Sequence, residues 1–210
     1  MNADLFHLLR QLVRDEIGRL RLPELAVVQA IHPHADKADD DNYAVTVRLR
    51  DDETVLARVP LATSRKGLAS IPDPGDLVLV QYLGGDPNAP VITATFYNDE
   101  DRPPVNSEGE AVLALPAEGG GVEIRAASSA TPAVTLAVGG ALTVKLQDDD
   151  PVVSVEGAGA TVRIDSDGAV TISTAGDLSI EGGELAISGT QVTIEAAGEL
   201  TLKGARINLN

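Results

Sequence analysis

The chain has 210 residues, of which 32 are acidic and 16 are basic, and its formal net charge is −16. This charge disfavours binding to nucleic acid phosphates or to an anionic membrane surface. Cys is absent, which excludes a disulfide framework, a thiol nucleophile and a Cys-ligated zinc site.

The first residues carry no targeting signal. Met1–Asp4 lack the basic segment that opens a secretion signal. No apolar run in the chain approaches the roughly 20 residues that a membrane span needs. We therefore expect no stable membrane insertion.

Residues 1–23 are predicted to form an N-terminal helix. Apolar residues recur there at steps of three and four, from Leu5 to Leu20, and Pro23 marks the end. An amphipathic helix needs a surface that covers its apolar side. Two interpretations remain open: the helix packs on its own domain, or it serves as an oligomerisation or docking helix.

Residues 24–97 are predicted to form a small β domain with five short strands. The segment Tyr43–Leu49 alternates apolar and polar residues, as a half-buried strand does. The turn at Asp73–Asp76 precedes the apolar run Leu77–Tyr82, and Val91–Tyr97 supplies the last strand. Five short strands with polar turns fit a small closed barrel of the OB type.

The composition changes sharply after this domain. Residues 98–110 are rich in acidic residues and include Pro103 and Pro104, which indicates a linker. None of the five aromatic residues of the chain follows Tyr97. Any core formed by residues 111–210 must therefore be narrow and use Val, Ile, Leu and Ala in place of rings.

Residues 111–210 are predicted to be a repeat of short β units. Each unit places two apolar residues two positions apart, so that both side chains point to one face. Looser units begin at Val122, and the last units start at intervals of seven or eight residues. These last units are Val170–Ile172, Leu178–Ile180, Leu185–Ile187, Val192–Ile194, Leu200–Leu202 and Ile207–Leu209. Such self-similarity predicts a β-helix or β-solenoid.

A unit of about eight residues buries too few side chains to offset the entropy of ordering its backbone. Such units must close on themselves or on copies of the chain. In a one-chain parallel β-helix, three units make one coil, which fits the 22 residues from Val170 to Val192. In a three-chain β-helix, each chain supplies one strand to every layer around a common axis. The slim interior without rings favours the three-chain form, and both closures remain open at this point.

Several short motifs carry a family resemblance. They are a Gly-Asp-Leu-Val-Leu-Val strand from Gly75, a Gly-Asp-Pro turn from Gly85, and a Tyr-Asn-x-x-x-x-Pro-Pro exit that ends at Pro104. This pattern resembles the OB-fold core of phage baseplate assembly protein V, VgrG proteins of type VI secretion and the spikes of contractile injection systems. The ring-free repeat also resembles the spike shaft of that family, and the resemblance covers about residues 24–210.

The resemblance implies a mainly β fold with an N-terminal helix, an OB-fold barrel and a C-terminal intertwined trimeric β-helix that forms a spike shaft. It implies a homotrimeric central spike at the baseplate tip of a contractile phage tail or injection particle, which pierces the target envelope when the sheath contracts. The expected partner at the barrel is a baseplate hub or tube-initiator protein. Assembly is expected in the bacterial cytoplasm, followed by incorporation into a phage tail or tail-like particle. The role is structural, so we expect no enzyme activity, catalytic residue, metal or cofactor.

The C-terminal residues of the chain would lie at the tip of such a spike. Some spikes of this family end in a His-x-His iron site, but no His follows His34 in this chain. In a trimer, Ile207 and Leu209 would leave an apolar end that needs a cover. The resemblance implies that a PAAR-type tip protein binds there. The expected tip-protein interface is therefore Ile207, Asn208, Leu209 and Asn210.

Other candidate sites are better explained as loops and turns. His32, His34, Asp36 and Asp39–Asp41 could contribute to a metal site, but a solvated loop between strands is the favoured interpretation. Asp148–Asp150 and Asp165–Gly168 are expected to be exposed turns.

Three other functions fit parts of the sequence. The main alternative is a single-chain β-helix protein that binds or degrades polysaccharide, although its sugar-binding face would normally need aromatic platforms and residues 98–210 contain no ring. A Ser-based catalytic triad is disfavoured separately, because no His lies downstream of Ser128. A trimeric adhesin or receptor-binding fibre would need a recognition head, for which the repeat leaves no room. Nucleic acid binding by the OB domain would need a basic groove with stacking rings.

Overall fold

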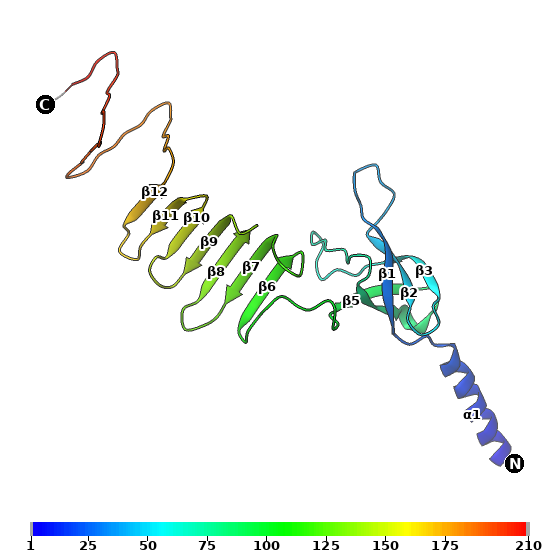
Figure 1. Cartoon of the computed structure of the whole chain (residues 1–210). Helices are drawn as coiled ribbons and strands as arrows, with labels where there is room; N and C mark the ends of the chain where they lie inside the picture. The colour runs from blue at the N-terminus through cyan, green and yellow to red at the C-terminus, as the bar shows by residue number, and fades with distance from the viewer. Residues whose placement is uncertain (1, 209–210) are drawn as a thin grey trace.

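The computed structural model describes residues 2–208 and has four parts that follow one another (Figure 1). An N-terminal helix comes first, then a curled five-stranded sheet, then a seven-stranded sheet, and finally an extended segment. The N-terminal helix and the C-terminal segment lie at opposite ends of the molecule. The predicted N-terminal helix and the mainly β content are confirmed.

Helix α1 covers Asn2–Arg19. It ends there because the amide of Leu20 still reaches the carbonyl of Ile17 at 3.1 Å, whereas the amide of Arg21 donates to the carbonyl of Gly85 at 2.9 Å. Every side chain from residue 6 to residue 20 is exposed. The interpretation that this helix packs on its own domain is therefore wrong for the described residues. No helix within residues 2–208 is both long and apolar enough to cross a membrane.

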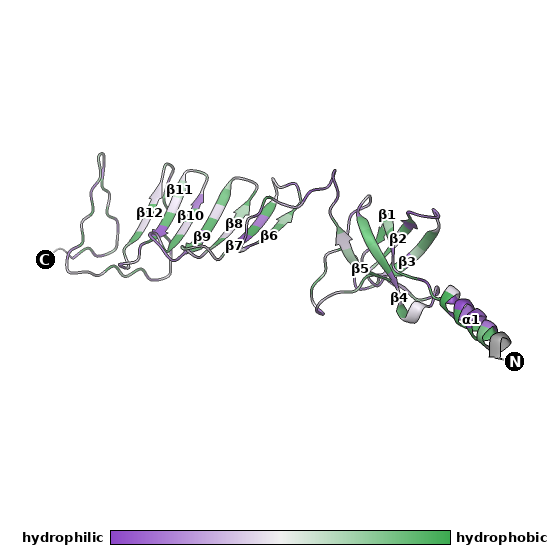
Figure 2. Ribbon diagram, turned by 90° about the horizontal axis from the view of Figure 1, so that it is seen from below, coloured by the Kyte–Doolittle hydropathy of each residue, from purple (hydrophilic) through white to green (hydrophobic). Residues whose placement is uncertain are grey.

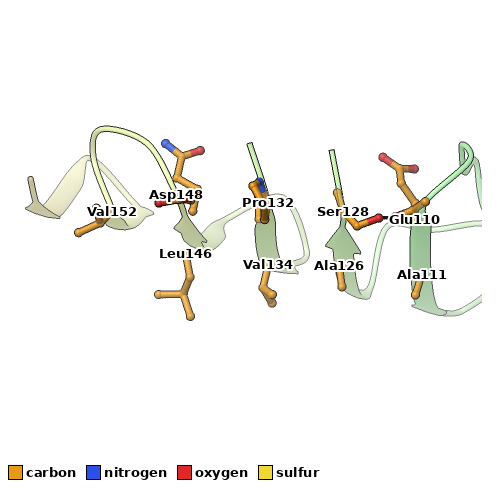
Figure 3. Close-up of a pocket in the computed structure, with 13 residues that line it drawn as sticks. Glu110, Ala111, Ala126, Ser128, Pro132, Val134, Leu146, Asp148 and Val152 are labelled. Atoms are coloured by element: carbon orange, nitrogen blue, oxygen red, sulfur yellow. Dashed lines mark hydrogen bonds between the residues drawn. The ribbon is translucent and has the colours of Figure 1, made fainter. Parts of the chain in front are cut away.

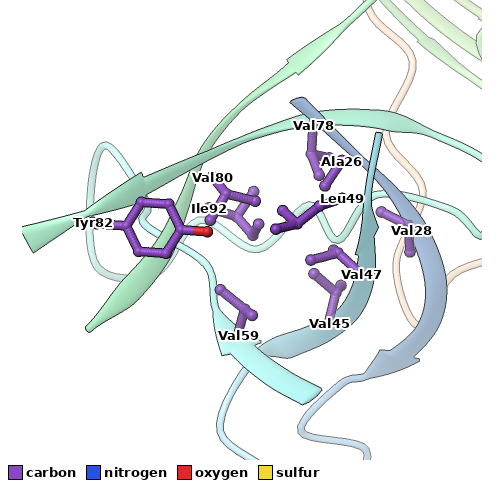
Figure 4. Packing of buried hydrophobic residues seen from close by; sticks show 10 residues of the cluster. All are labelled: Ala26, Val28, Val45, Val47, Leu49, Val59, Val78, Val80, Tyr82 and Ile92. Carbon is purple, nitrogen blue, oxygen red and sulfur yellow. The ribbon is translucent and has the colours of Figure 1, made fainter. Parts of the chain in front are cut away.

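The first sheet contains the five predicted strands. They are β1 (Glu24–His32), β2 (Ala44–Leu49), β3 (Val55–Pro60), β4 (Leu77–Tyr82) and β5 (Pro90–Phe96), with the short 3-10 turn η1 (Leu83–Gly85) after β4. The strand order is β3-β2-β1-β4-β5, and all neighbours are antiparallel. The sheet curls around one core, which Figure 4 shows from close by. The buried residues of this core are Ala26, Val28, Val45, Val47, Leu49, Val59, Val78, Val80, Tyr82 and Ile92.

The curled sheet is not closed into a barrel, in contrast to the prediction. Among the described residues, the edge strands meet at one isolated parallel bridge between Leu61 and Ile92, where the amide of Ala62 donates to Ile92 at 2.8 Å. Strand β3 ends at Pro60, which has no N–H to continue a ladder toward β5.

The second sheet contains strands β6 to β12. Their bounds are β6 (Glu110–Leu115), β7 (Val122–Ala127), β8 (Ala133–Val138), β9 (Leu142–Gln147), β10 (Val153–Gly157), β11 (Ala160–Ile164) and β12 (Val170–Thr174). Each strand pairs antiparallel with the next one along the chain, so the sheet is a meander. Figure 2 shows the strands standing side by side in one layer.

This meander corrects the predicted strand pairing. The one-chain parallel β-helix is wrong for residues 110–174, because neighbouring strands there run antiparallel. The intertwining expected of a three-chain β-helix is also not found in this range, since one chain supplies seven consecutive strands of the same sheet. The physical reason is local: strands of five or six residues are joined by two to six residues, and such hairpins close at little entropic cost.

Candidate functional site

One complete face of the seven-stranded sheet is apolar. The register places one apolar residue of each strand directly opposite the next, in a column that crosses the whole sheet. We call this the middle column, and it contains Leu113, Ile124, Leu136, Val144, Val155, Val162 and Ile172. Because side chains two positions apart share a face, a further column flanks it on each side.

The flanking columns are apolar as well, except at Gly157 and Thr174. Figure 3 shows Ala111, Ala126, Val134 and Leu146 on one side of the sheet, whereas Glu110 lies on the other. One flanking column contains Ala111, Ala126, Val134, Leu146, Val153, Ile164 and Val170. The other contains Leu115, Val122, Val138, Leu142, Gly157, Ala160 and Thr174. We call the three columns together the apolar face.

The opposite face is polar and internally paired. The guanidinium of Arg125 donates to Glu110 at 2.8 Å and to Glu123 at 3.0 Å, and the hydrogen bond to Glu123 is the main reason that its pKa is raised. The register alternates cations and hydroxyls across the sheet: Lys145 and Arg163 both lie opposite Ser154, whose residue surface is 7% exposed. This polar face can stay in contact with water, whereas the apolar face needs a partner that covers it.

The chain does not cover its own apolar face. Ile124 is 41% exposed, Leu113 52% and Ile172 56%, although each lies in the middle of a strand. An exposed apolar surface of this extent is rare on a monomer and marks an interaction site. The apolar face is therefore the candidate functional surface of this protein.

The extended segment from Ala175 to Asn208 adds a second unsatisfied surface. Its repeat units were predicted as strands, but the structure assigns no strand there, and no amide from Gly176 to Asn208 donates to a backbone carbonyl of residues 2–208. Up to Leu202, its large apolar side chains are at least half exposed. They are Leu178, Ile180, Leu185, Ile187, Val192, Ile194, Leu200 and Leu202. The zigzag path in Figure 1 therefore offers backbone donors and acceptors as well as apolar side chains to a partner.

The two acidic segments form turns between strands, as predicted. Asp148–Asp150 lie in the exposed turn between β9 and β10, and Asp165–Gly168 form the turn between β11 and β12. The two turns touch, because the amide of Ser166 donates to Asp150 at 2.6 Å, and this bond lowers the pKa of the Asp150 carboxyl. Their role in the structure is to connect adjacent strands.

The histidine loop after β1 is held by hydrogen bonds within the chain. The Nε2 atom of His32 lies 2.9 Å from the hydroxyl of Thr46, and Nδ1 of His34 lies 3.0 Å from the carbonyl of Asp41. The carboxylate of Asp41 forms an ion pair with Arg58. Within residues 2–208, no group of three His, Cys, Asp or Glu side chains is arranged to hold a metal ion.

The expected tip residues are only partly described. Ile207 is 49% exposed and Asn208 ends the described chain, whereas Leu209 and Asn210 lie outside the described residues. Their assignment to a tip-protein interface stays a prediction.

Two features were missed by the sequence analysis. Strand β6 falls where the linker was expected to end, although Ala111, Leu113 and Leu115 alternate with other residues as a strand does. The continuous columns were missed as well, because a period of two gives the face of each side chain but not the register between strands.

Segments of both sheets match known protein families. Residues 35–97 match the family described as the type VI secretion system/phage-baseplate injector OB domain. Residues 117–182 and 182–210 match the haemagglutinin repeat. The first match covers the curled sheet from the histidine loop onward, and the second covers most of the meander and the extended segment.

Two curated relatives come from Pseudomonas aeruginosa. They are the type VI secretion system spike proteins VgrG1a and VgrG1b, each 30% identical over 121 residues. The aligned part is 57% of this chain but only 15% and 13% of those proteins, so this chain spans a small fraction of their length. Together with the OB-domain match, these similarities confirm the resemblance to VgrG-like baseplate spikes that the motifs around Gly75 and Gly85 indicated.

Proposed function

We propose that this chain is the structural central spike of a contractile tail or injection particle, and that three copies close into one shaft. The observation that carries the proposal is the apolar face, which is complete along seven strands and uncovered in a single chain. Similarity of the curled sheet to an injector OB domain supports the place of this shaft in a baseplate.

The dimensions of the sheet favour three copies. A strand of five or six residues is about 17–20 Å long, which sets the side of a triangular prism. The distance from each side of such a triangle to its axis is about 5–6 Å, close to half of the roughly 10 Å between packed sheets. Val, Leu, Ile and Ala side chains fill this depth, and aromatic rings are not needed.

The extended segment is explained by the same threefold arrangement. Its units lack backbone partners within residues 176–208, and strands from two other copies would supply them if the three chains interleave. Closure of this kind leaves no free sheet edge along the shaft, which removes the usual route to aggregation. Residues 98–210 contain 18 acidic and 6 basic residues, so three copies form a strongly acidic and soluble rod.

In this arrangement the two ends of the rod have different partners. The curled sheet faces a baseplate hub or tube-initiator protein, and the C-terminal residues Ile207–Asn210 carry a PAAR-type tip protein. A stiff rod that is driven by sheath contraction pierces an envelope mechanically, without catalysis. We place assembly in the bacterial cytoplasm, before the rod becomes part of the particle.

Quantitative mass spectrometry of contractile particles from the source bacterium tests this role. We expect three copies of the chain per particle, and loss of intact particles when its gene is deleted. Intact particles that lack the chain would contradict the proposal.

The tip assignment has its own test. Ile207→Asp should weaken capture of a PAAR-type protein from the same particle at least tenfold, because it places charge on an apolar end. Thr201→Asp, at the polar position of the preceding unit, is the matched control and should bind normally. Equal capture by both variants would overturn the assignment.

The haemagglutinin-repeat match favours a second candidate, an adhesive fibre. That function predicts that the purified chain binds cell surfaces without any other particle component. The spike proposal expects no such binding, so a cell-binding assay with the isolated chain separates the two functions.

A further inference from the structure

Helix α1 presents an apolar side that nothing in its own chain covers. Phe6, Leu9, Val13, Ile17 and Leu20 are between 51% and 66% exposed. At 3.6 residues per turn they lie on one side of the helix, around a shallow groove formed by Phe6, Leu9 and Val13. An isolated helix of this length is only marginally stable in water, so this side needs a partner.

The helix is held in a fixed direction by its junction with the curled sheet. The guanidinium of Arg21 donates to Glu24 at 2.5 Å and to Asp52 at 3.1 Å, and it lies 5.5 Å from the ring centre of Tyr82. A Cβ atom on Gly85 would lie 2.6 Å from the side chain of Leu20, so the end of the helix packs closely on the turn after β4. Both ribbon views show α1 leaving this junction away from the seven-stranded sheet (Figures 1 and 2).

We propose that the three α1 helices of the spike pack their apolar sides against one another as a parallel bundle at the end opposite the shaft tip. This inference rests on the proposed function, because it takes the three copies from the shaft. Once the shaft has brought the copies together, the helices meet at a high effective concentration, so even weak pairwise attraction is sufficient.

The charges beside the apolar side are complementary between copies. Arg10 and Arg14 border the groove on one side, whereas Glu16 borders the apolar side on the other, next to Leu9. In a parallel bundle with threefold symmetry, Arg14 of one copy comes beside Glu16 of the next, because residues two positions apart differ in height by only about 3 Å. Within its own chain, Glu16 also pairs with Arg19 at 3.0 Å.

Engineered cysteines test the bundle cleanly, because the chain contains no Cys. Leu9→Cys places a thiol on the apolar side, and Gln11→Cys places one about 200° around the helix as the matched control. Under mild oxidation of the full chain, we expect Leu9→Cys to form disulfide-linked dimers at least tenfold faster than Gln11→Cys. The yield should approach two thirds of the chains, because three adjacent thiols form one disulfide and leave one thiol.

The mass of each sample in solution separates this inference from the proposed function. If both variants have the mass of three chains but cross-link equally slowly, the bundle is overturned and α1 is left to dock on a hub protein, while the trimeric spike stands. If the mass is that of one chain, both proposals fail. As a second test, adding Arg14→Glu to Leu9→Cys should slow cross-linking, and adding Glu16→Arg as well should restore it. An unchanged rate in the Arg14→Glu variant would contradict the charge pairing.

Discussion

Arg21 joins three parts of the molecule through one guanidinium. It follows α1, its side chain binds Glu24 of β1 and Asp52 of the β2–β3 turn, and it lies over the ring of Tyr82 in β4. The hydrogen bond to Glu24 is the main cause that raises the pKa of Arg21, so this cation stays charged. Asp52 and Tyr82 are far from Arg21 in the sequence, which is why no local pattern predicted these contacts.

Arg21→Ala should therefore lower the stability of the curled sheet. The loss leaves the Glu24 carboxylate, which is 19% exposed, without its cation. Because the ion pairs are partly solvated, we expect the free energy of unfolding to fall by about 1 kcal/mol. Urea unfolding should show this loss as a lower midpoint with an unchanged slope. Arg50→Ala is the control, since Arg50 is exposed and forms no ion pair among the described residues. Equal midpoints for the two variants would contradict this role.

Asp150 gives the second prediction at this scale. The amide of Ser166 lowers its pKa in the folded chain below the ordinary value of 3.8. The carboxylate therefore adds stability above pH 3.8, and this contribution is lost as the pH falls through the lowered pKa. In Asp150→Asn, urea unfolding measured below pH 4 should show a smaller fall of stability than in the natural chain. An identical fall in both proteins would show that this hydrogen bond does not couple to folding.

At the scale of elements, the sequence predicts strands better than it predicts their partners. Alternation located β2, and the turn signal before an apolar run located β4, because each strand buries one face in a compact core. The same alternation at Val170–Ile172 and Leu178–Ile180 has two outcomes, since the first lies in β12 and the second has no partner strand. Three-residue units offer too few ladder bonds to offset the ordering of their connectors, so their pairing depends on other chains. The apolar face could be predicted residue by residue, whereas its columns needed the register.

Charge reversal on one element tests which face is buried. Leu136→Asp places a carboxylate in the middle column, where three copies would bring it into the dry interior at a cost of several kcal/mol each. Thr135→Asp is the control, because this position lies on the polar face opposite Arg125 and Lys145. Light scattering should find dissociated chains for the first variant and an intact assembly for the second. Intact assembly of both variants would exclude the apolar face as the interface.

At the scale of the whole molecule, the extended segment has no stable fold of its own. Amides from Gly176 to Asn208 lack backbone acceptors within the described chain, so a lone chain would exchange them at the rate of an unfolded peptide. In the trimer, hydrogen exchange should find the repeat units at Leu185–Ile187 and Val192–Ile194 protected by at least a hundredfold. Fast exchange of these units in the assembled protein would refute the interleaving of the three chains.

The central claim is that three chains form one shaft, and the mass in solution tests it most directly. Light scattering on a size-exclusion column, over a wide range of concentrations, should give about 65.4 kDa, three times the chain mass of 21.8 kDa. The particle should also elute early for this mass, because a rod has a large hydrodynamic radius. A constant mass of 21.8 kDa with β-type circular dichroism would contradict the trimeric spike.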